Sequence, residues 1–231
     1  MSPNDIDLRM DTFEFQRLKE LATFITEIWE ENPSLLGKPQ YFVLDNSLYL
    51  SHNSYSSKNK DNYYLGFGHM LRQSPEYSIE ELKAIVAHEL GHILKNHLEI
   101  TASIINILNQ VSSFSFLTYL SGTAEILELL TAAYLRNLER EANTEAIRMY
   151  PNPYAHISAT EKLEKNRDTF LPLLEQHIID LYLSIKQRLV PIPDEYTSTH
   201  PSVAETISFF KQHITEDSCA FDGEKASQCS I

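Results

Sequence analysis

The sequence predicts an α+β fold that is predominantly α-helical. Apolar residues recur at helical spacing through most of the chain, and two Ser-x-x-Glu capping boxes begin at Ser78 and Ser158. Residues typical of strands gather early in the chain, between positions 41 and 71. We therefore expect a small N-terminal sheet of about three short strands beside a larger set of helices.

The first third of the chain alternates between these two patterns. Apolar side chains repeat every three or four residues over 12–31 and predict a helix, which Pro33 ends. Residues 41–50 are rich in β-formers and are interrupted in the middle, which predicts a short hairpin. Residues 51–62 are mostly Ser, Asn and Lys and predict a loop, whereas 63–71 return to strand-like composition.

Helices are expected through most of the remainder. The capping box at Ser78 opens a long helix, expected to run to about residue 99. Residues 100–124 carry no charge and are long enough to cross a bilayer, but their amides and serines favour a buried or amphipathic helix. A further helix is expected over 123–149, ended by Pro151 and Pro153.

The C-terminal third is expected to form shorter helices. Ser158 and Glu161 form a capping box that predicts a helix start. Helical segments are also expected over 173–189 and about 201–213. The sequence shows no convincing linker, so we expect one domain over residues 1–215, followed by a flexible polar tail over 216–231.

Composition excludes several classes of function. The 231 residues carry a net charge of -13, which disfavours a nucleic-acid partner. Two cysteines, Cys219 and Cys229, make neither a disulfide framework nor a cysteine-based zinc site. The N-terminal residues show no basic segment followed by an apolar run, so cytoplasmic folding is expected, with later export left open.

The long central helix carries the residues that indicate chemistry, His88-Glu89-Leu-Gly-His92. Two histidines four positions apart lie about 40° apart around a helix, so both rings can bind one metal ion. Two imidazoles suit Zn²⁺, and Glu89 is placed to act as a general base toward a water molecule. The alternative is a structural helix with two incidental surface histidines.

A catalytic zinc site needs a third protein ligand. His97 follows His92 by five residues, about 140° away on a continuous helix, so we expect a surface or capping histidine instead. Glu139 falls on an apolar, small-residue face of its predicted helix, whereas Glu141 falls on a solvated face. A carboxylate on an apolar face needs a reason such as a cation, so the pattern favours Glu139 as the ligand. The alternatives are an ordinary, partly buried Glu139 that pairs with a base such as Arg136, and Glu141 as the ligand.

Two further sets of residues are candidates for the site. Asn143, one turn after Glu139, can accept a hydrogen bond from a ligand imidazole and so orient its ring. The segment Tyr64, Leu65, Gly66 and Phe67 is a candidate for substrate binding, as an exposed sheet edge that pairs with an extended peptide. The alternative for this segment is an ordinary hairpin strand that packs on the active-site helix.

The combination of His88-Glu-Leu-Gly-His92 with Arg136-x-x-Glu139-x-x-Ala-Asn143 resembles the HtpX-type and CAAX-prenyl-endopeptidase gluzincins, and more closely their small soluble relatives, the minigluzincins. Thr199-His200-Pro-Ser-Val-Ala-Glu resembles a third motif of that family. The resemblance covers roughly residues 41–210. It implies a zincin-like domain in which one helix supplies two zinc ligands and a later helix supplies the third.

The resemblance also implies a zinc endopeptidase with one Zn²⁺ per chain, held by His88, His92 and Glu139, and with a peptide or protein substrate. Glu89 would be the general base, and His200 would donate to the tetrahedral intermediate unless it is an ordinary surface histidine. Asn143 stands where the family has Asp, which removes a negative charge behind the zinc ligand.

Thr206 stands where family members usually carry Arg, which concerns substrate or transition-state stabilisation. These departures keep two alternatives open: a catalytically weak or inactive zinc-binding interaction protein, and a zymogen inhibited by its own C-terminal segment. A helical structural protein without metal is a further alternative. Contact with a membrane surface is possible but not favoured, and the sequence leaves the oligomeric state unknown.

Overall fold

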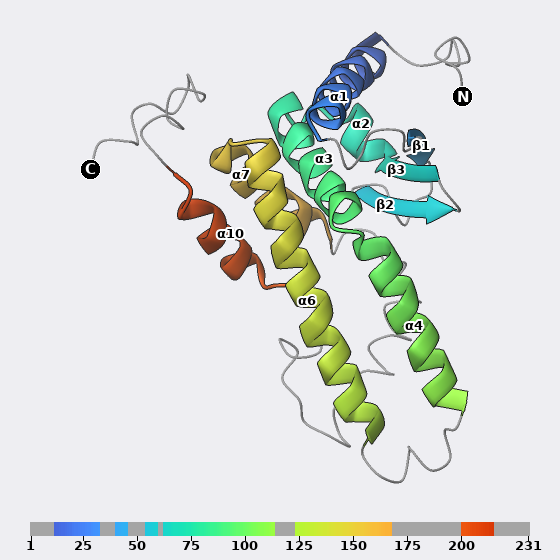
Figure 1. Ribbon diagram of the computed structural model, residues 1–231. Helices are drawn as coiled ribbons and strands as arrows, with labels where there is room; N and C mark the ends of the chain where they lie inside the picture. Colours follow the sequence, from blue (N-terminus) through green and yellow to red (C-terminus); the bar gives the residue numbers. More distant parts are fainter. Residues whose placement is uncertain are drawn as a thin grey trace.

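Helix α3 (Ile79–Leu94) runs through the middle of the computed structural model, which describes residues 12–32, 40–45, 54–59, 62–113, 123–167 and 200–214 (Figure 1). Helices α1, α6 and α7 and strand β2 pack against α3. In chain order the other elements are α1 (Thr12–Glu31), β1 (Gln40–Asp45), β2 (Ser54–Asn59), β3 (Asn62–Gly68), α2 (His69–Gln73), α4 (His97–Ser113), α6 (Thr123–Met149), α7 (Pro153–Arg167) and α10 (Val203–Lys211). The described residues confirm a mostly helical α+β protein.

Two long helices have the bounds that the sequence predicts. α1 covers residues 12–31 and α6 covers residues 123–149. The apolar stripe of α1 is buried, with Leu21, Ile25 and Ile28 each at most 3% exposed. Burial of one apolar face on the rest of the domain stabilises a helix of this kind more than its intrinsic propensity does.

The start of α3 is the predicted capping box, but its end is earlier than predicted. The Ser78 hydroxyl accepts from the Glu81 amide at 3.2 Å, and the Glu81 carboxylate accepts from the Ser78 amide at 2.7 Å. The helix ends at Leu94 rather than near residue 99, because Asn96 adopts a left-handed φ of 57°. Helix α4 then starts at His97, after a short break in the chain (Figure 1).

The sheet has three strands in the order β1-β3-β2. β1 pairs parallel to the central strand β3, and β2 pairs antiparallel to it on the other side. The predicted loop over 51–62 is therefore wrong, because β2 forms there. The predicted strand over 63–71 is right only as far as Gly68, where α2 follows. The described partner of β1 is β3, and the rest of the hairpin predicted for 41–50 lies outside the described residues.

Pairing with β3, rather than local composition, explains why the polar segment of β2 is a strand. Tyr55 lies opposite Gly66 in the register. A Cβ atom on Gly66 would come within 2.2–2.7 Å of the Tyr55 ring, so the ring lies over the space that glycine leaves. The glycine therefore permits close approach, as its position in a strand predicts. Strand formation of this kind depends on cross-strand packing, which composition alone does not reveal.

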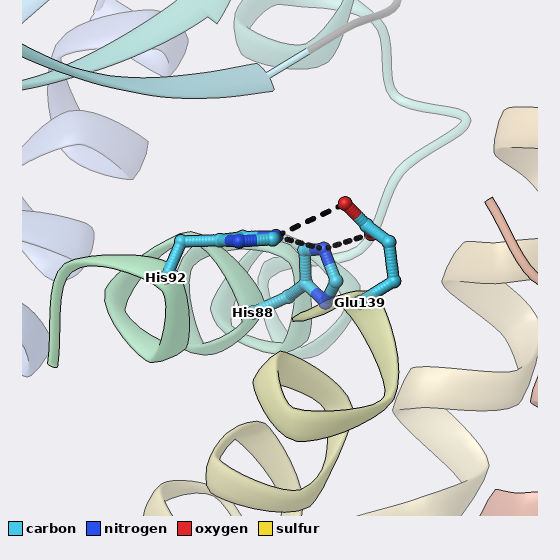
Figure 2. A group of neighbouring side chains, drawn as sticks. All are labelled: His88, His92 and Glu139. Carbon is cyan, nitrogen blue, oxygen red and sulfur yellow. Dashed lines mark hydrogen bonds and ion pairs between the residues drawn. The ribbon is translucent and has the colours of Figure 1, made fainter. Parts of the chain in front are cut away.

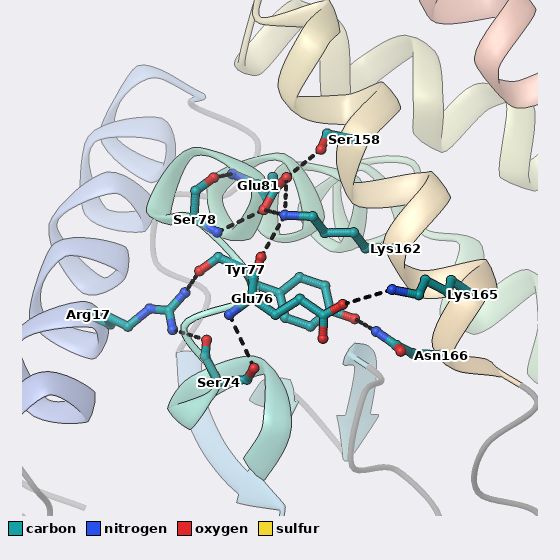
Figure 3. A network of polar contacts seen from close by, with 10 residues as sticks. All are labelled: Arg17, Ser74, Glu76, Tyr77, Ser78, Glu81, Ser158, Lys162, Lys165 and Asn166. Atoms are coloured by element: carbon teal, nitrogen blue, oxygen red, sulfur yellow. Dashed lines mark hydrogen bonds and ion pairs between the residues drawn. The ribbon is translucent and has the colours of Figure 1, made fainter. Parts of the chain in front are cut away.

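Helix α7 begins at Pro153, five residues before the predicted capping box at Ser158. Proline is well suited to the first turn of a helix, where its missing N–H costs nothing. Ser158 instead lies within α7 and donates to the Glu81 carboxylate, which also accepts from Lys162 at 2.7 Å (Figure 3). These contacts attach α7 to the start of α3.

The same region also anchors α1. Arg17 of α1 donates to the Ser74 carbonyl at 2.6 Å and to the Tyr77 carbonyl, just before the start of α3 (Figure 3). Arg17 is 6% exposed, so these bonds satisfy a cation that would otherwise be buried at considerable cost. The N-terminal end of α3 is therefore held between α1 and α7.

The remaining predictions about the fold are only partly tested. Helix α10 lies within the predicted range 201–213. The predicted helix over 173–189 and the tail over 216–231 lie outside the described residues. Helices α4 and α6 cover the described parts of 100–124, and among the helices of the described residues we find none with the length and apolar character needed to cross a membrane.

One buried histidine joins α7 to α10. His156 is 3% exposed, and its ring stacks on Phe210 at a centroid distance of 4.5 Å. Its Nε2 lies 2.9 Å from the Tyr150 carbonyl, which requires Nε2–H to donate. Burial lowers the pKa of His156 to about 4, although the hydrogen bond to Tyr150 opposes this shift. His156 is therefore neutral in the folded protein at pH 7.

This burial predicts a specific loss of stability in acid. Below pH 6.5 the unfolded chain binds a proton on His156, whereas the folded protein binds it only near pH 4. Stability from the neutral ring is therefore present above pH 6.5 and lost as the pH falls through about 4, by about 3 kcal/mol. In urea unfolding of the metal-free protein, the free energy of unfolding should fall less between neutral and acid pH in His156→Gln than in wild type, by about this amount. The exposed His213→Gln is the matched control, and parallel curves for His156→Gln and wild type would contradict the prediction.

Candidate functional site

His88 and His92 lie one turn apart on α3 and face the same side of the helix. Their Nε2 atoms are 3.1 Å apart, and their ring centroids are 4.8 Å apart. The spacing of the motif and the continuity of α3 through residue 92 produce this arrangement. The structure thus brings the two imidazoles together, as the sequence predicts.

Helix α6 adds a carboxylate to this pair. The two carboxylate oxygens of Glu139 lie 3.3 Å from His88 Nε2 and 3.5 Å from His92 Nε2 (Figure 2). The Glu139 side chain is 17% exposed, whereas that of Glu141 is 47% exposed. The apolar face of α6, on which Ala142 is fully buried, carries Glu139 toward α3. Glu139, rather than Glu141, therefore lies beside the two histidines.

The three side chains fit a zinc ion. One ligand atom from each of His88, His92 and Glu139 lies within 4.8 Å of the others, and no other such group occurs among the residues that the structure describes. A tetrahedral Zn²⁺ with bonds of about 2.0–2.2 Å holds its ligand atoms about 3.3–3.6 Å apart. The two Nε2 atoms are 3.1 Å apart, and the His88 and His92 Nε2 atoms lie 3.3 and 3.5 Å from different oxygens of Glu139, distances close to this range. Two imidazoles and a carboxylate are also ligands that zinc commonly takes.

The electrostatics of the cluster favour a cation. Burial lowers the pKa of His88, but the hydrogen bond and negative charge of Glu139 outweigh it and raise this pKa to about 9. Burial raises the pKa of Glu139, but hydrogen bonds from His88 and His92 outweigh it and hold this pKa well below its usual range. Glu139 is therefore ionised, and its field stabilises positive charge at the imidazole Nε2 atoms.

The other nitrogen of His88 has its own partner. Its Nδ1 lies 2.9 Å from Oδ1 of Asn143, which is 7% exposed. An amide oxygen only accepts, so Nδ1–H donates and the proton of the neutral ring sits there. The Nε2 lone pair is then free to bind a metal. Asn143 is thus in the place predicted for it.

His97 does not have the surface or capping position that the sequence predicts. It is 2% exposed, and its Nδ1 lies 3.0 Å from Nδ1 of His92. Its Nε2 lies 3.4 Å from a carboxylate oxygen of Glu141. The prediction is wrong because it assumed a continuous helix, whereas the left-handed residue Asn96 redirects the chain immediately before His97.

Glu89 follows His88 directly on α3, and a residue of the sheet holds its side chain. It is 8% exposed, and Ser54 of β2 donates to its carboxylate at 2.9 Å. A hydrogen bond of this kind holds a carboxylate in one orientation. Ser54 was not predicted as a site residue, since it lies in a polar segment that gives no local sign of its pairing.

His200 approaches the cluster from the C-terminal part of the chain. Its Nε2 lies 3.7 Å from a Glu139 oxygen, and its side chain is 67% exposed. Ser202, two residues later, caps α10, and Glu205 in the first turn of α10 accepts from Arg140 of α6 at 2.6 Å. The structure therefore places His200 beside Glu139 on the open side of the cluster.

The segment Tyr64, Leu65, Gly66 and Phe67 does not form an exposed sheet edge. These residues belong to β3, the central strand, which pairs with β1 on one side and β2 on the other. Leu65 and Phe67 are at most 2% exposed. A substrate peptide therefore cannot pair with this segment as a free sheet edge. β2, which carries Ser54, is the outer strand of the described sheet on the side toward α3.

A comparison with protein families gives the wider relationship. The model described as Peptidase family M48 matches residues 69–214, more than half of the 231 residues. The chain belongs to peptidase family M48. Its match includes His88, His92, Glu139 and His200, and membership of M48 implies a metallopeptidase of a family that is typically zinc-dependent. No curated protein matches the chain at a significant level.

Gly91, inside the histidine motif of this M48 chain, sets the distance between the two helices that carry the cluster. A Cβ atom on Gly91 would come within 2.7 Å of the Ala142 carbonyl oxygen and 3.1 Å of its Cα. These are backbone atoms of α6, which cannot turn aside as a side chain can. Glycine is therefore required for the close approach of α3 and α6.

Replacement of this glycine should have the reverse of its usual effect. Gly→Ala inside a helix normally stabilises by about 1 kcal/mol. Gly91→Ala should instead destabilise the protein by about 1–3 kcal/mol, because the new methyl group overpacks the contact with α6. It should also weaken zinc binding, since α6 carries Glu139. Urea unfolding of the metal-free protein and chelator competition measure the two effects. A variant more stable than wild type would refute this role of Gly91.

Proposed function

We propose that the chain is a zinc-dependent endopeptidase of the HtpX-like type, with His88, His92 and Glu139 as the ligands of one Zn²⁺. The observation that supports this most is the convergence of one ligand atom from each residue to within 4.8 Å of the others, with the two Nε2 atoms 3.1 Å apart and each near a different Glu139 oxygen. The resemblance to minigluzincins supports the same subtype. When bound, zinc supplies a lowered pKa for a water molecule and polarises the scissile carbonyl.

Glu89 is the proposed general base. Its carboxylate follows His88 directly on α3, and the hydrogen bond from Ser54 keeps one oxygen occupied. The other oxygen remains to take a proton from the attacking water and pass it to the leaving amine. Its position places it on the same rigid helix as two of the proposed ligands.

His200 is the proposed donor to the oxygen of the tetrahedral intermediate. Its Nε2 lies 3.7 Å from Glu139, so the ring is beside the cluster without being buried in it. Its 67% exposure leaves room for a substrate to approach. A donor at this place stabilises the negative charge that develops during attack.

A peptide substrate is expected to bind in an extended form along β2. This strand is on the side of the sheet toward α3, and Ser54 at its start reaches Glu89. Pairing with a strand uses backbone hydrogen bonds, which provide affinity with little demand on sequence. A scissile bond aligned along β2 would lie near Glu89. The net charge of -13 favours basic or neutral peptides over nucleic acid.

The replacement of the family Asp by Asn143 favours one alternative, a zinc-binding protein with weak or no activity. Turnover of an unfolded protein such as casein separates the two. The self-inhibited zymogen depends on the tail over 216–231, which lies outside the described residues. The single domain over 1–215 and the cytoplasmic location stay predictions.

Zinc content tests the ligand set. Purified protein should hold one zinc per chain by elemental mass spectrometry, and Glu139→Ala should lower the affinity by more than the factor of about 10–100 expected for an outer partner. Removing Glu139 deletes a ligand and leaves two imidazoles. Arg148→Ala, near the C-terminal end of the same helix and 54% exposed, is the control. A Glu139→Ala protein with full zinc affinity would contradict the assignment.

Peptide cleavage tests the general base. Glu89→Ala should keep its zinc and lose casein cleavage by a factor of about 10²–10⁴, because the variant lacks the proposed proton acceptor. Elemental analysis of the same preparation shows that the metal site is intact. Ser54→Ala should have a much smaller effect, since it removes only an orienting hydrogen bond. Retained cleavage in Glu89→Ala would sink this role.

A further inference from the structure

We propose that His97 and Glu141 form a hydrogen-bonded support behind His92, which holds this imidazole in the tautomer and orientation needed to bind zinc. The inference rests on the proposed zinc site and adds two positioning residues to it. Neither residue is one of the three proposed ligands. Both act on the metal through His92.

The direction of the hydrogen bonds follows from the atoms involved. Nε2 of His92 faces Glu139 and His88, so it is the nitrogen that must offer its lone pair. The proton of neutral His92 then sits on Nδ1, which lies 3.0 Å from Nδ1 of His97. Nδ1–H of His92 therefore donates to His97, which must carry its own proton on Nε2.

Glu141 accepts the last hydrogen bond of this series, which starts at His92. Nε2 of His97 lies 3.4 Å from a Glu141 carboxylate oxygen, which only accepts. Asn137, one turn earlier on α6, donates to the other Glu141 oxygen at 2.7 Å. This bond restrains the Glu141 side chain, which is 47% exposed. Each donor in this series of hydrogen bonds, which links Asn137, Glu141, His97 and His92, thus has an acceptor. The arrangement admits one tautomer for the His97 ring and one for the His92 ring.

The break between α3 and α4 makes the contact possible. On a continuous helix, His97 would lie about 140° around the axis from His92. The left-handed backbone of Asn96 ends α3 and brings His97, the first residue of α4, back beside His92 with 2% exposure. A left-handed conformation is uncommon outside glycine, although asparagine tolerates it better than most residues.

The support differs from the one behind His88. His88 donates to the neutral amide of Asn143, whereas the hydrogen bonds behind His92 end on a carboxylate. A carboxylate partner raises the basicity of a metal-binding imidazole, and its loss typically costs about 10–100-fold in metal affinity. His92, rather than His88, is therefore the ligand that receives this electrostatic help.

A purely structural role for His97 makes a different prediction. The rings of His92 and His97 are in edge-to-face contact at 5.1 Å, which an aromatic residue without nitrogen can also make. If packing alone matters, His97→Phe should bind zinc normally and Glu141→Ala should have no effect. If the hydrogen bonds matter, both changes should weaken zinc binding.

Zinc affinity by competition with a chelator of known affinity tests the proposal, independently of peptidase activity. Glu141→Ala and His97→Phe should each bind zinc about 10–100-fold more weakly than wild type. The double variant should be no weaker than His97→Phe, since the two residues act in series. His97→Asn should recover part of the loss, because its amide oxygen can replace Nδ1 as acceptor. Glu161→Ala, an exposed helical glutamate on α7, is the control and should be unchanged.

The outcomes separate this proposal from the proposed function. Wild-type affinity in both Glu141→Ala and His97→Phe overturns the support and leaves the three ligands standing. Additive losses in the double variant also overturn it. Weakened zinc binding in protein that never cleaves peptides supports the positioning role and refutes the peptidase. A wild-type protein that binds no zinc overturns both. Thermal melting of the metal-free variants checks folding, and the half-exposed Glu141 provides a test even if the buried His97 variants fail to fold.

Discussion

The close approach of α3 and α6 is the contact on which the rest of the site depends. Gly91 lies so near the Ala142 backbone that a methyl group would be 2.7 Å from its carbonyl oxygen. At this helix separation the short side chain of Glu139 reaches both His88 and His92. A shift of α6 by about the width of a methyl group would exceed the slack in hydrogen-bond and metal-ligand distances. The packing distance between α3 and α6 therefore also determines the geometry of the three-residue cluster.

The same contact explains why the cluster attracts a cation. It places an ionised carboxylate, whose side chain is 17% exposed, beside two imidazoles. Without a metal ion, the Nε2 atoms of His88 and His92, 3.1 Å apart, need a proton between them, because two lone pairs facing each other repel. A metal ion satisfies all three groups at once. The polar network around Glu81 and Arg17 holds the other end of α3, so the ligands sit on a helix that is fixed along its length.

Local patterns predicted the features that depend on one helix at a time. The Ser78 capping box, the bounds of α1 and α6, and the shared face of His88 and His92 all follow from periodicity and capping. The position of Glu139 rather than Glu141 beside the histidines was also predictable, because a carboxylate on an apolar helix face needs a partner of opposite charge. Ser158 shows the limit of such reasoning, since its hydroxyl bonds to Glu81 of another helix instead of capping its own.

The features that were missed depend on contacts distant in sequence or on a single backbone torsion. The strand β2 forms because it pairs with β3, and that pairing makes β3 central rather than an edge. His97 was misplaced because one residue, Asn96, adopts a left-handed conformation that the prediction did not include. The error in placing His97 bears on function. The replacement of the family Asp by Asn143 suggests a weakened site only if the residues behind the second ligand, His92, are left out of account. If His97 and Glu141 support His92 as we propose, a carboxylate still stabilises the bound metal from the outer side. The loss of charge behind one ligand then does not by itself argue for an inactive protein.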